Sequence, residues 1–445
     1  MATKKRKIWG WMFFDWANQP FHTLILTFIF GPYFISAVAA DPVEGQATWS
    51  FVTTIGAISI ALLAPIFGAI ADASGPRRPW IALFSLLYVI GVAGLWNAVP
   101  GMEDYTFVLI CFVLAMIGAE FSTVFVNSLL PLLGNRDEIG RISGSSWAFG
   151  YWGGLVSLVL VLGFMAPFPG NPTTILGMEP VFGLDPAMRE GDRATGPLSA
   201  IWFLVFIIPF ALWAPDTPRV AKTTGAVAKG FRELWRTIVT LPKQRELFAY
   251  LMSSMFYRDA LNGLFLFGGG YAAGVLGWET FQLGVFGIIA AFLGAIGAWI
   301  GGISDSRFGP KPVINFCIVA LIIVSCVTIS TGPGEVFFMD VGADSGLPTL
   351  VFYICGGVIG AAGGSLQSAS RTMLVRQADP AKMTEAFGIY ALAGKATAFL
   401  APLLIGIATV VSESQRIGVT PVIALFVIGL VLMAWVSREG RAVNA

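Results

Sequence analysis

The sequence predicts an all-α polytopic membrane protein with twelve transmembrane helices, arranged as two pseudo-symmetric halves of six helices each. Three observations carry this prediction. Only 12% of the 445 residues are charged and 56% are hydrophobic, whereas about 25% of a typical soluble chain is charged. Apolar runs of about 20 residues, long enough to cross a bilayer, recur along the chain. One loop motif occurs twice, about half a chain apart.

The apolar segments divide the chain into an N-terminal half, residues 1–214, a linker, 215–245, and a C-terminal half, 246–445. We expect helices over residues 9–39, 50–71, 79–99, 106–131, 143–166, 198–214, 246–275, 281–303, 312–331, 349–372, 384–410 and 419–437. With the N-terminus inside, 22 of the 27 Lys and Arg residues fall in cytoplasmic segments and three in outer loops. Positive loops resist translocation, so both termini and the linker are expected to be cytoplasmic.

A tight loop with the pattern Gly-x-x-x-Asp-x-x-Gly-x-Arg-Arg separates the second and third predicted helices. Gly68 is expected to let two helices approach closely, Asp72 to end the first helix, and Gly75 to turn the chain. Arg77 and Arg78 are expected to stay in the cytoplasm. Asp72 should lie against the N-terminus of a neighbouring helix, where the helix dipole favours an anion. We interpret the loop as a latch.

A weaker copy of this loop separates the eighth and ninth predicted helices. Asp305 follows Asp72 by 233 residues, and Gly309 and Lys311 correspond to the turn glycine and the basic residue. Two copies, each between predicted spans, indicate a duplicated chain with a second gating loop.

The first helix carries polar residues that a membrane makes costly. Asp15 and Asn18 are three residues apart and share one face, which would face a cavity; Asp15 is also close enough to the helix start to be a solvated charge. Pro20 permits a kink, because it leaves a carbonyl without its usual donor. His22 is the single histidine and titrates near neutral pH. Both proton coupling and packing stay open for it.

Four further candidates lie on the fourth and fifth helices. Glu120 is near mid-membrane and either faces a cavity or pairs with another helix. Asn127 is close to the end of the same helix. Trp147 and Tyr151 are four residues apart and share a face, which either lines a substrate path or fills the bundle.

The seventh helix repeats the pattern of the first. Asp259 and Asn262 have the Asp-x-x-Asn spacing of Asp15 and Asn18, with an offset of 244 residues. Arg258 lies beside Asp259, and neither charge can be free in lipid. One of the two is therefore expected to meet a partner across the bundle.

The tenth and eleventh helices complete the candidate set. Gln367 follows Asn127 by 240 residues, and Tyr390 precedes Lys395 by five. We expect Lys395 about three turns inside the eleventh helix, where a lysine pairs with a carboxylate or binds an anionic group. Snorkelling of the side chain to the membrane interface is the alternative.

Two connecting segments have distinct compositions. The outer loop 167–198 is rich in Pro and Gly and is expected to be irregular and solvated. Ala226–Leu241, within the basic linker, is predicted to form an amphipathic helix on the membrane surface.

Several classes of protein are disfavoured. The sequence has no His/Cys metal cluster, no Gly-x-Ser-x-Gly and no phosphate loop. We therefore expect that the protein is not an enzyme and that it binds no metal, no cofactor and no nucleic acid. A channel is disfavoured because there is no filter segment and no ring of repeated charge.

The duplicated loop resembles loops 2/3 and 8/9 of the major facilitator superfamily. Other stretches resemble one branch of it, the vacuole-effluxer, autophagy-related family and its bacterial relatives. The matching motifs lie at Phe14–Asn18 and Phe21, at Phe125, Asn127, Leu130 and Pro131, within Gly140–Gly154, at Asp259–Asn262, within Gly363–Arg371 and within Phe387–Lys395.

This resemblance implies a secondary transporter whose halves open a midplane site alternately to the two sides. The family's best-known activity is amino-acid export from the vacuole. For this chain the implied substrate is a small polar solute, an amino acid or related metabolite, with export favoured and proton coupling open. A monomer in a bacterial plasma membrane is expected. A drug or organic-ion exporter and a non-transporting membrane sensor are the alternatives. The residues expected to meet at the centre are Asn18, His22, Glu120, Asn127, Asp259, Asn262, Gln367 and Lys395.

Overall fold

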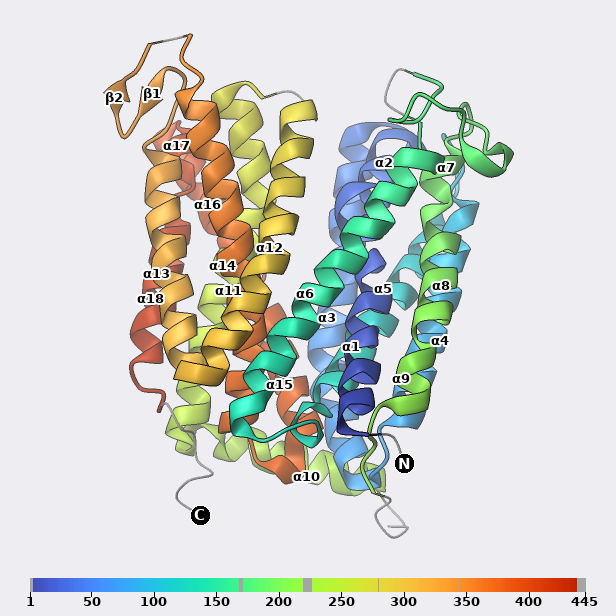
Figure 1. The fold of residues 1–445 in the computed structure, drawn as a ribbon, viewed down its shortest axis with the longest axis vertical. Helices are drawn as coiled ribbons and strands as arrows, with labels where there is room; N and C mark the ends of the chain where they lie inside the picture. Colours follow the sequence, from blue (N-terminus) through green and yellow to red (C-terminus); the bar gives the residue numbers. More distant parts are fainter. Residues whose placement is uncertain (1–2, 168–170, 219–225, 279, 343, 438–445) are drawn as a thin grey trace. The chain divides into compact units, whose positions relative to one another are not determined.

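The computed structural model describes residues 3–167, 171–218, 226–278, 280–342 and 344–437. Within these ranges the chain is almost entirely helical (Figure 1). The strands among the described residues, β1 (Glu335–Val336) and β2 (Met339–Asp340), pair as a short antiparallel hairpin. The predicted all-α fold is therefore confirmed, and the chain divides into two compact units.

The first unit comprises Met1–Ala64, Ala73–Leu129 and Phe149–Thr224. Its elements are α1 (Lys4–Pro20), η1 (Phe21–Phe28), α2 (Phe30–Tyr33), η2 (Phe34–Val38), most of α3 (Pro42–Ser74), α4 (Arg78–Gly94), η3 (Leu95–Asn97), α5 (Thr106–Asn127), the later part of α6 (Arg136–Leu160), η5 (Val161–Met165), η6 (Val181–Gly183), α7 (Glu190–Arg193), α8 (Thr195–Phe206) and α9 (Ile208–Trp213).

The second unit comprises Pro65–Asp72, Leu130–Ala148 and Gly225–Ala445, so it includes one end of α3 and the start of α6. Its other elements are η4 (Leu130–Leu132), α10 (Ala226–Thr240), η7 (Leu241–Lys243), α11 (Arg245–Leu276), α12 (Thr280–Phe308), α13 (Pro310–Ile329), β1, β2, α14 (Leu347–Gln377), η8 (Pro380–Lys382), α15 (Met383–Ala396), α16 (Leu400–Ser412), α17 (Gln415–Gly418) and α18 (Pro421–Met433).

Eleven helical stretches within the described residues are long and apolar enough to cross a membrane. The remaining predicted span forms α11, which has 32 residues. At 1.5 Å per residue α11 is about 48 Å long, more than a bilayer core requires. Its lower hydropathy reflects the polar residues around Arg258 that the sequence singles out.

The first span changes character at Pro20, as the sequence predicts. After Pro20 the backbone continues as the π-helical segment η1, which contains His22. Proline has no N–H to donate to the carbonyl four residues earlier, which is that of Trp16. The indole N–H of Trp202 on α8 donates to this carbonyl instead, at 3.0 Å. The proline therefore fixes a contact between α1 and α8.

The predicted helix 384–410 is present as the membrane-length stretch Pro380–Ser412, but it is interrupted. Two helices, α15 and α16, occupy it, separated by residues 397–399. Pro402 explains the break, because it cannot donate to the carbonyl of Ala398. Lys395 consequently lies in the last turn of α15 and not three turns from an end. A cation is favoured at this position by the helix dipole.

The described part of segment 167–198, which we expected to be an irregular outer loop, is only partly irregular, and this corrects a second expectation. Its last residues form α7 and the start of α8, and Asp192 and Arg193 are each only 7% exposed. The Nε atom of Arg193 donates to the Trp96 carbonyl at 3.0 Å, and its guanidinium lies 4.6 Å from the Trp96 ring centroid. These contacts bury a cation that composition alone assigns to solvent.

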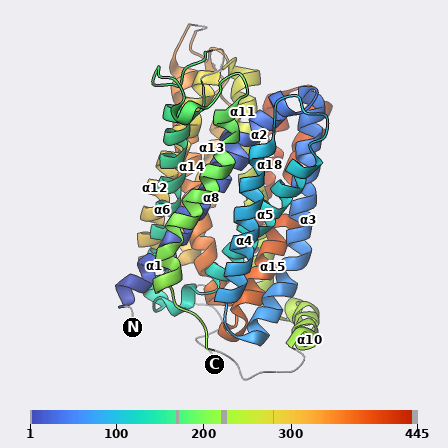
Figure 2. The same cartoon turned by 90° about the vertical axis from the view of Figure 1, so that its right-hand side faces the viewer.

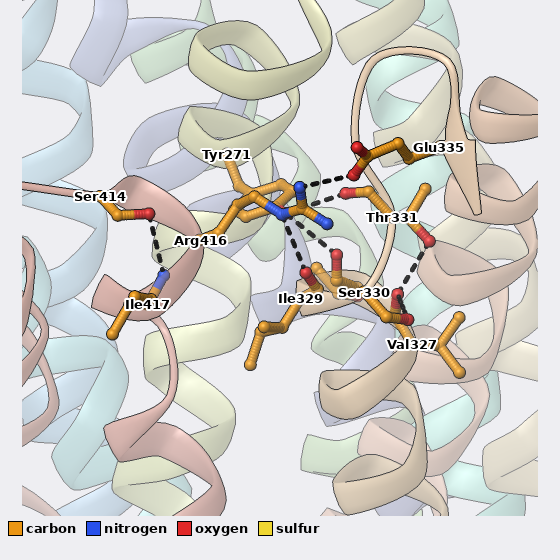
Figure 3. Close-up of polar contacts among 10 residues, drawn as sticks. Tyr271, Val327, Ile329, Ser330, Thr331, Glu335, Ser414, Arg416 and Ile417 are labelled. Carbon is orange, nitrogen blue, oxygen red and sulfur yellow. Dashed lines mark hydrogen bonds and ion pairs between the residues drawn. The ribbon is translucent and has the colours of Figure 1, made fainter. Parts of the chain in front are cut away.

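Arg416 connects several elements at one end of the second unit (Figure 3). Its Nη1 atom forms an ion pair with Oε2 of Glu335 at 2.9 Å, and its Nε atom donates to the Ile329 carbonyl at 3.1 Å. Tyr271 on α11 donates to the carbonyls of Thr328 and Thr331, both at 3.0 Å. The loop after α13 is thus held by side chains from α11 and α17.

The linker contains α10, in agreement with the amphipathic helix expected over Ala226–Leu241. It lies across the direction of the long helices of the second unit, since it is seen along its length in Figure 1 and close to end-on in Figure 2.

Candidate gating and substrate-binding sites

The carboxylate of Asp72 lies at the N-terminus of α15. It accepts hydrogen bonds from the backbone N–H groups of Thr384, at 3.3 Å, and Glu385, at 2.8 Å. The first N–H groups of a helix have no partner within the helix, and the helix dipole there favours an anion. The predicted position of Asp72 is therefore present, although α3 continues two residues beyond it, to Ser74.

Gly68, one turn before Asp72, allows this close contact. A Cβ atom on Gly68 would lie 2.6 Å from the carbonyl oxygen of Thr384. Any larger residue would push α3 away from the start of α15. The spacing Gly-x-x-x-Asp thus places a residue without a side chain and a carboxylate on the same face of α3, near its end.

The rest of the loop is tied to the start of the linker. Gly75 has φ 101°, a left-handed conformation that favours glycine. The backbone N–H of Arg77 donates to Oδ1 of Asp216 at 2.8 Å, and its Nη1 donates to Oγ1 of Thr217 at 2.8 Å. Arg78 donates to the carbonyl of Ala214. The two arginines therefore hold the beginning of the linker.

The second copy of the loop has different contacts. Asp305 is fully buried, with Oδ1 4.0 Å from Nη2 of Arg376 on α14. A Cβ atom on Gly140 of α6 would lie 2.6 Å from Cγ of Asp305, so α6 packs directly against this carboxylate. Gly309 has φ 85°, and Lys311 donates to the carbonyl of Val436. Asp305 thus meets an arginine, where Asp72 meets a helix start.

Arg371, near the end of α14, forms a contact that sequence reasoning missed. Its Nε atom donates to Oγ of Ser143 at 2.9 Å, and its Nη2 donates to the Ser143 carbonyl at 2.8 Å. The guanidinium also lies 5.7 Å from the Trp147 ring centroid. Arg371 is only 4% exposed. The available signal was the arginine that closes the motif at 363–371.

The polar residues of α11 meet the end of α15. Nη1 of Arg258 donates to the Tyr390 carbonyl at 3.0 Å, and the guanidinium lies 4.1 Å from the Tyr390 ring centroid. Gly394 leaves room for this arginine, because a Cβ there would lie 2.5 Å from Cζ of Arg258. Within the described part of the chain, no carboxylate forms an ion pair with Arg258. Its positive charge is held by a carbonyl and an aromatic face.

Two buried tyrosines extend this cluster toward α14. The ring of Tyr250 stacks on that of Tyr390, with centroids 6.2 Å apart. Tyr250 donates to the Ser370 carbonyl at 2.5 Å, and the hydroxyls of Tyr257 and Ser370 are 2.7 Å apart. Hydrogen-bonded networks of this kind fix side-chain positions. We call Tyr250, Tyr257, Arg258, Ser370 and Tyr390 the arginine–tyrosine cluster.

Asp259 points to the helix break. It is 1% exposed, and its Oδ2 accepts from the backbone N–H of Ala401 at 3.1 Å, at the start of α16. Oδ1 has no hydrogen-bond partner among the described residues. Arg258 and Asp259 therefore meet different helices, one at the end of α15 and the other at the start of α16, in agreement with the expectation that a partner lies across the bundle.

The first unit positions its own candidates on α1, η1 and α5. Nδ2 of Asn18 donates to Oγ1 of Thr123 on α5 at 3.3 Å, and Asn18 is 5% exposed. A Cβ on Gly150 would lie 3.3 Å from Asp15, so α6 packs on α1 there. The ring of His22 packs edge-to-face on Phe21, 5.5 Å between centroids.

Other candidates have less specific surroundings. Glu120, Asn127 and Tyr151 of the first unit and Gln367 of the second are half-buried, and Asn262 is exposed. Within the second unit the structure brings Arg258 and Tyr390 together beside Lys395. The convergence of the first unit's candidates with these residues stays a prediction.

Solved structures with the same fold include the outward-conformation major facilitator transporter FucP, with a TM-score of 0.71, 14% identity, and coverage of 97% of this chain and 98% of that one. The human organic anion transporter MFSD10 aligns with a TM-score of 0.70 and 14% identity over 97% of this chain and all of its own. The chain therefore has the fold of the major facilitator transporters.

Sequence relatives narrow the class. The MFS-type transporter YxiO of Bacillus subtilis (strain 168) is 24% identical over 433 residues, which are 97% of this chain and 94% of YxiO. Autophagy-related protein 22 of Botryotinia fuckeliana (strain B05.10) is 22% identical over 239 residues, which are 49% of this chain and 40% of that protein. Residues 43–445 match the family described as vacuole effluxer Atg22 like. The chain belongs to this family, and the family resemblance seen in the sequence is confirmed.

Proposed function

We propose that this protein is a secondary transporter that exports a small polar solute bearing a carboxylate, an amino acid or a related metabolite, by alternating access. The observation that carries the proposal is that Arg258 is a positioned cation without a carboxylate partner among the described residues. It lies within a membrane helix, it is positioned by Tyr390 and Gly394, and no described carboxylate neutralises it. Charged residues inside membrane proteins mark substrate pathways, and arginine suits a carboxylate because its donors form a planar fork.

Lys395 supports the same assignment. It follows Gly394, on which the Arg258 guanidinium lies, and it occupies the last turn of α15. Broken helices whose ends point at a ligand recur in secondary transporters. A solute carboxylate would therefore meet two cations, while its ammonium would be bound by a carboxylate such as Glu120. Export follows the description of the family as a vacuole effluxer.

Asp259 is our proposed proton site. Its Oδ1 is buried and has no partner among the described residues, so protonation would remove the cost of an unpaired charge. Its Oδ2 is bonded to α16, so a change of charge would act on the helix that follows the break. Coupling to a proton gradient would pass through this contact.

The experiment is transport in proteoliposomes with labelled amino acids, with and without an imposed pH gradient. Arg258→Gln should raise KM by tenfold or more, because hydrogen bonds to charged groups contribute about 1.5–3 kcal/mol. Arg6→Gln, at an exposed position near the start of α1, is the matched control and should behave as wild type. Asp259→Asn should remove the response to the pH gradient while leaving exchange of solute between the two sides.

Two outcomes would overturn the proposal. Normal transport by both Lys395→Ala and Glu120→Gln would exclude the assigned pairing of charges. Absence of transport of any amino acid, together with transport of larger organic anions, would favour the second candidate function, an organic-anion exporter. That candidate is supported by the same cation beside the stacked rings of Tyr250 and Tyr390.

A further inference from the structure

The amphipathic helix α10 packs one face against the second unit. Gly230, Leu234 and Thr237 share this face at helical spacing. A Cβ on Gly230 would lie 3.0 Å from Cα of Ile70, and Leu234 is 6% exposed. Oγ1 of Thr237 accepts from Nζ of Lys382 at 3.3 Å.

These contacts join α10 to the latch. Ile70 precedes Asp72 by two residues on α3, and Lys382 directly precedes α15, whose first N–H groups bind Asp72. The packed face of α10 therefore touches both sides of the Asp72 contact. Any force that fixes α10 also fixes the two helix ends that make up the latch.

A second face of α10 is apolar and exposed. Phe231, Trp235, Ile238 and Val239 follow the helical repeat and are 50%, 70%, 44% and 55% exposed. We call these four residues the apolar stripe. Four large apolar side chains on one stripe of a short helix are typical of a helix that lies in the membrane interface.

Basic residues border the apolar stripe. Arg232 and Arg236 are one turn apart on the adjoining face, and both are exposed. Lys243 and Arg245, also exposed, follow the end of the helix. With the apolar stripe in the acyl region, guanidinium groups at its border lie at the level of the lipid phosphates. This charge complementarity selects anionic lipids over a neutral surface.

We propose that α10 binds anionic phospholipid headgroups through Arg232 and Arg236, and that this binding holds the start of α15 against Asp72. The membrane surface on this side then acts as a regulator of the latch. In a neutral membrane the apolar stripe still inserts but the arginines add nothing, so the latch opens more readily.

The test measures amide hydrogen exchange of the full-length protein in nanodiscs of phosphatidylcholine, with or without phosphatidylglycerol. The reporter is the segment containing Thr384 and Glu385, whose N–H groups bind Asp72. Phosphatidylglycerol should slow its exchange by roughly five- to thirty-fold, because each arginine near an anionic surface contributes about a factor of five. The double variant Arg232→Gln, Arg236→Gln should lose this lipid response.

Matched variants keep the result interpretable. The conservative pair Arg232→Lys, Arg236→Lys retains the charge and should retain most of the response. The pair Lys5→Gln, Arg6→Gln removes two exposed cations from α1 and should respond as wild type. Equal exchange in both lipids, a full response in the Gln double variant, or protection that depends on protein concentration would each overturn the proposal, the last because a second copy would then cover the apolar stripe.

Discussion

The Asp72 carboxylate accepts a 2.8 Å hydrogen bond from the backbone N–H of Glu385, which lies 313 residues later in the sequence. This contact joins the end of α3, within the first motif loop, to the start of α15, and both residues lie in the second unit. Because it links the end of α3 directly to the start of α15, we expect its loss to let these two helix ends separate more easily.

Replacing Asp72 tests the latch. Asp72→Asn keeps the shape of the side chain but removes the charge that the helix dipole favours, an effect of about 0.3–2 kcal/mol. We expect turnover to fall several-fold while KM for the solute changes little. Initial rates in proteoliposomes at several solute concentrations separate the two. Asp137→Asn, at an exposed position on α6, is the control, and an unchanged rate with lost binding would contradict the latch.

Gly68 should tolerate no side chain. In Gly68→Ala the new methyl group would lie 2.6 Å from the Thr384 carbonyl oxygen, and overpacking of this kind costs about 1–3 kcal/mol. We expect a lower thermal midpoint and faster amide exchange at Thr384 and Glu385. Gly284→Ala is the matched control, since a Cβ there has no atom within 4 Å. Equal stability of the two variants would disprove the close approach of α3 and α15.

The pair Arg371 and Ser143 should behave as a coupled unit. Arg371→Lys keeps the charge but loses the planar fork that contacts both oxygens of Ser143, so we expect a loss of about 1.5–3 kcal/mol in unfolding free energy. Ser143→Ala should cost about 1 kcal/mol. A double-mutant cycle measured by reversible unfolding should give a coupling energy above about 0.5 kcal/mol. Additive effects would show that the contact contributes little.

The two partners of the Arg416–Glu335 ion pair should contribute unequally to stability. Glu335→Gln should lower stability by less than about 1 kcal/mol, because the ion pair is partly exposed on both sides. Arg416→Gln should cost more, since it also loses the Ile329 carbonyl and the Phe338 ring, whose centroid is 5.3 Å from the guanidinium. Thermal midpoints of the two variants provide the comparison, and a larger loss for Glu335→Gln would be inconsistent with this arrangement.

Local chemistry explains which features could be predicted from the sequence. The helix lengths, the loop from Gly68 to Arg78 and the amphipathic helix α10 could all be predicted. They depend on patterns of hydropathy, glycine and charge among residues that are close together in the sequence. The change from α-helix to π-helix after Pro20 follows from one missing N–H group. The same reasoning applied to Pro402 would have predicted the interruption at residues 397–399.

Partners distant in sequence could not be predicted. Arg371 and Ser143 are 228 residues apart, and no pattern states which serine an arginine meets. The sequence predicts that Arg258 or Asp259 has a partner across the bundle, but it does not say which group that partner is. In the structure Arg258 contacts the carbonyl and the ring of Tyr390, whereas a carboxylate was equally consistent with the sequence. Burial of Arg193 likewise depends on Trp96, far outside its own loop.

The interruption at residues 397–399 has a mechanical consequence. The membrane-length stretch consists of two helices joined by a short non-helical segment. The start of α15 is bonded to Asp72, and the start of α16 is bonded to Asp259. We therefore expect each helix to be able to tilt separately, so that a rearrangement near Asp72 need not be transmitted to the contact at Asp259.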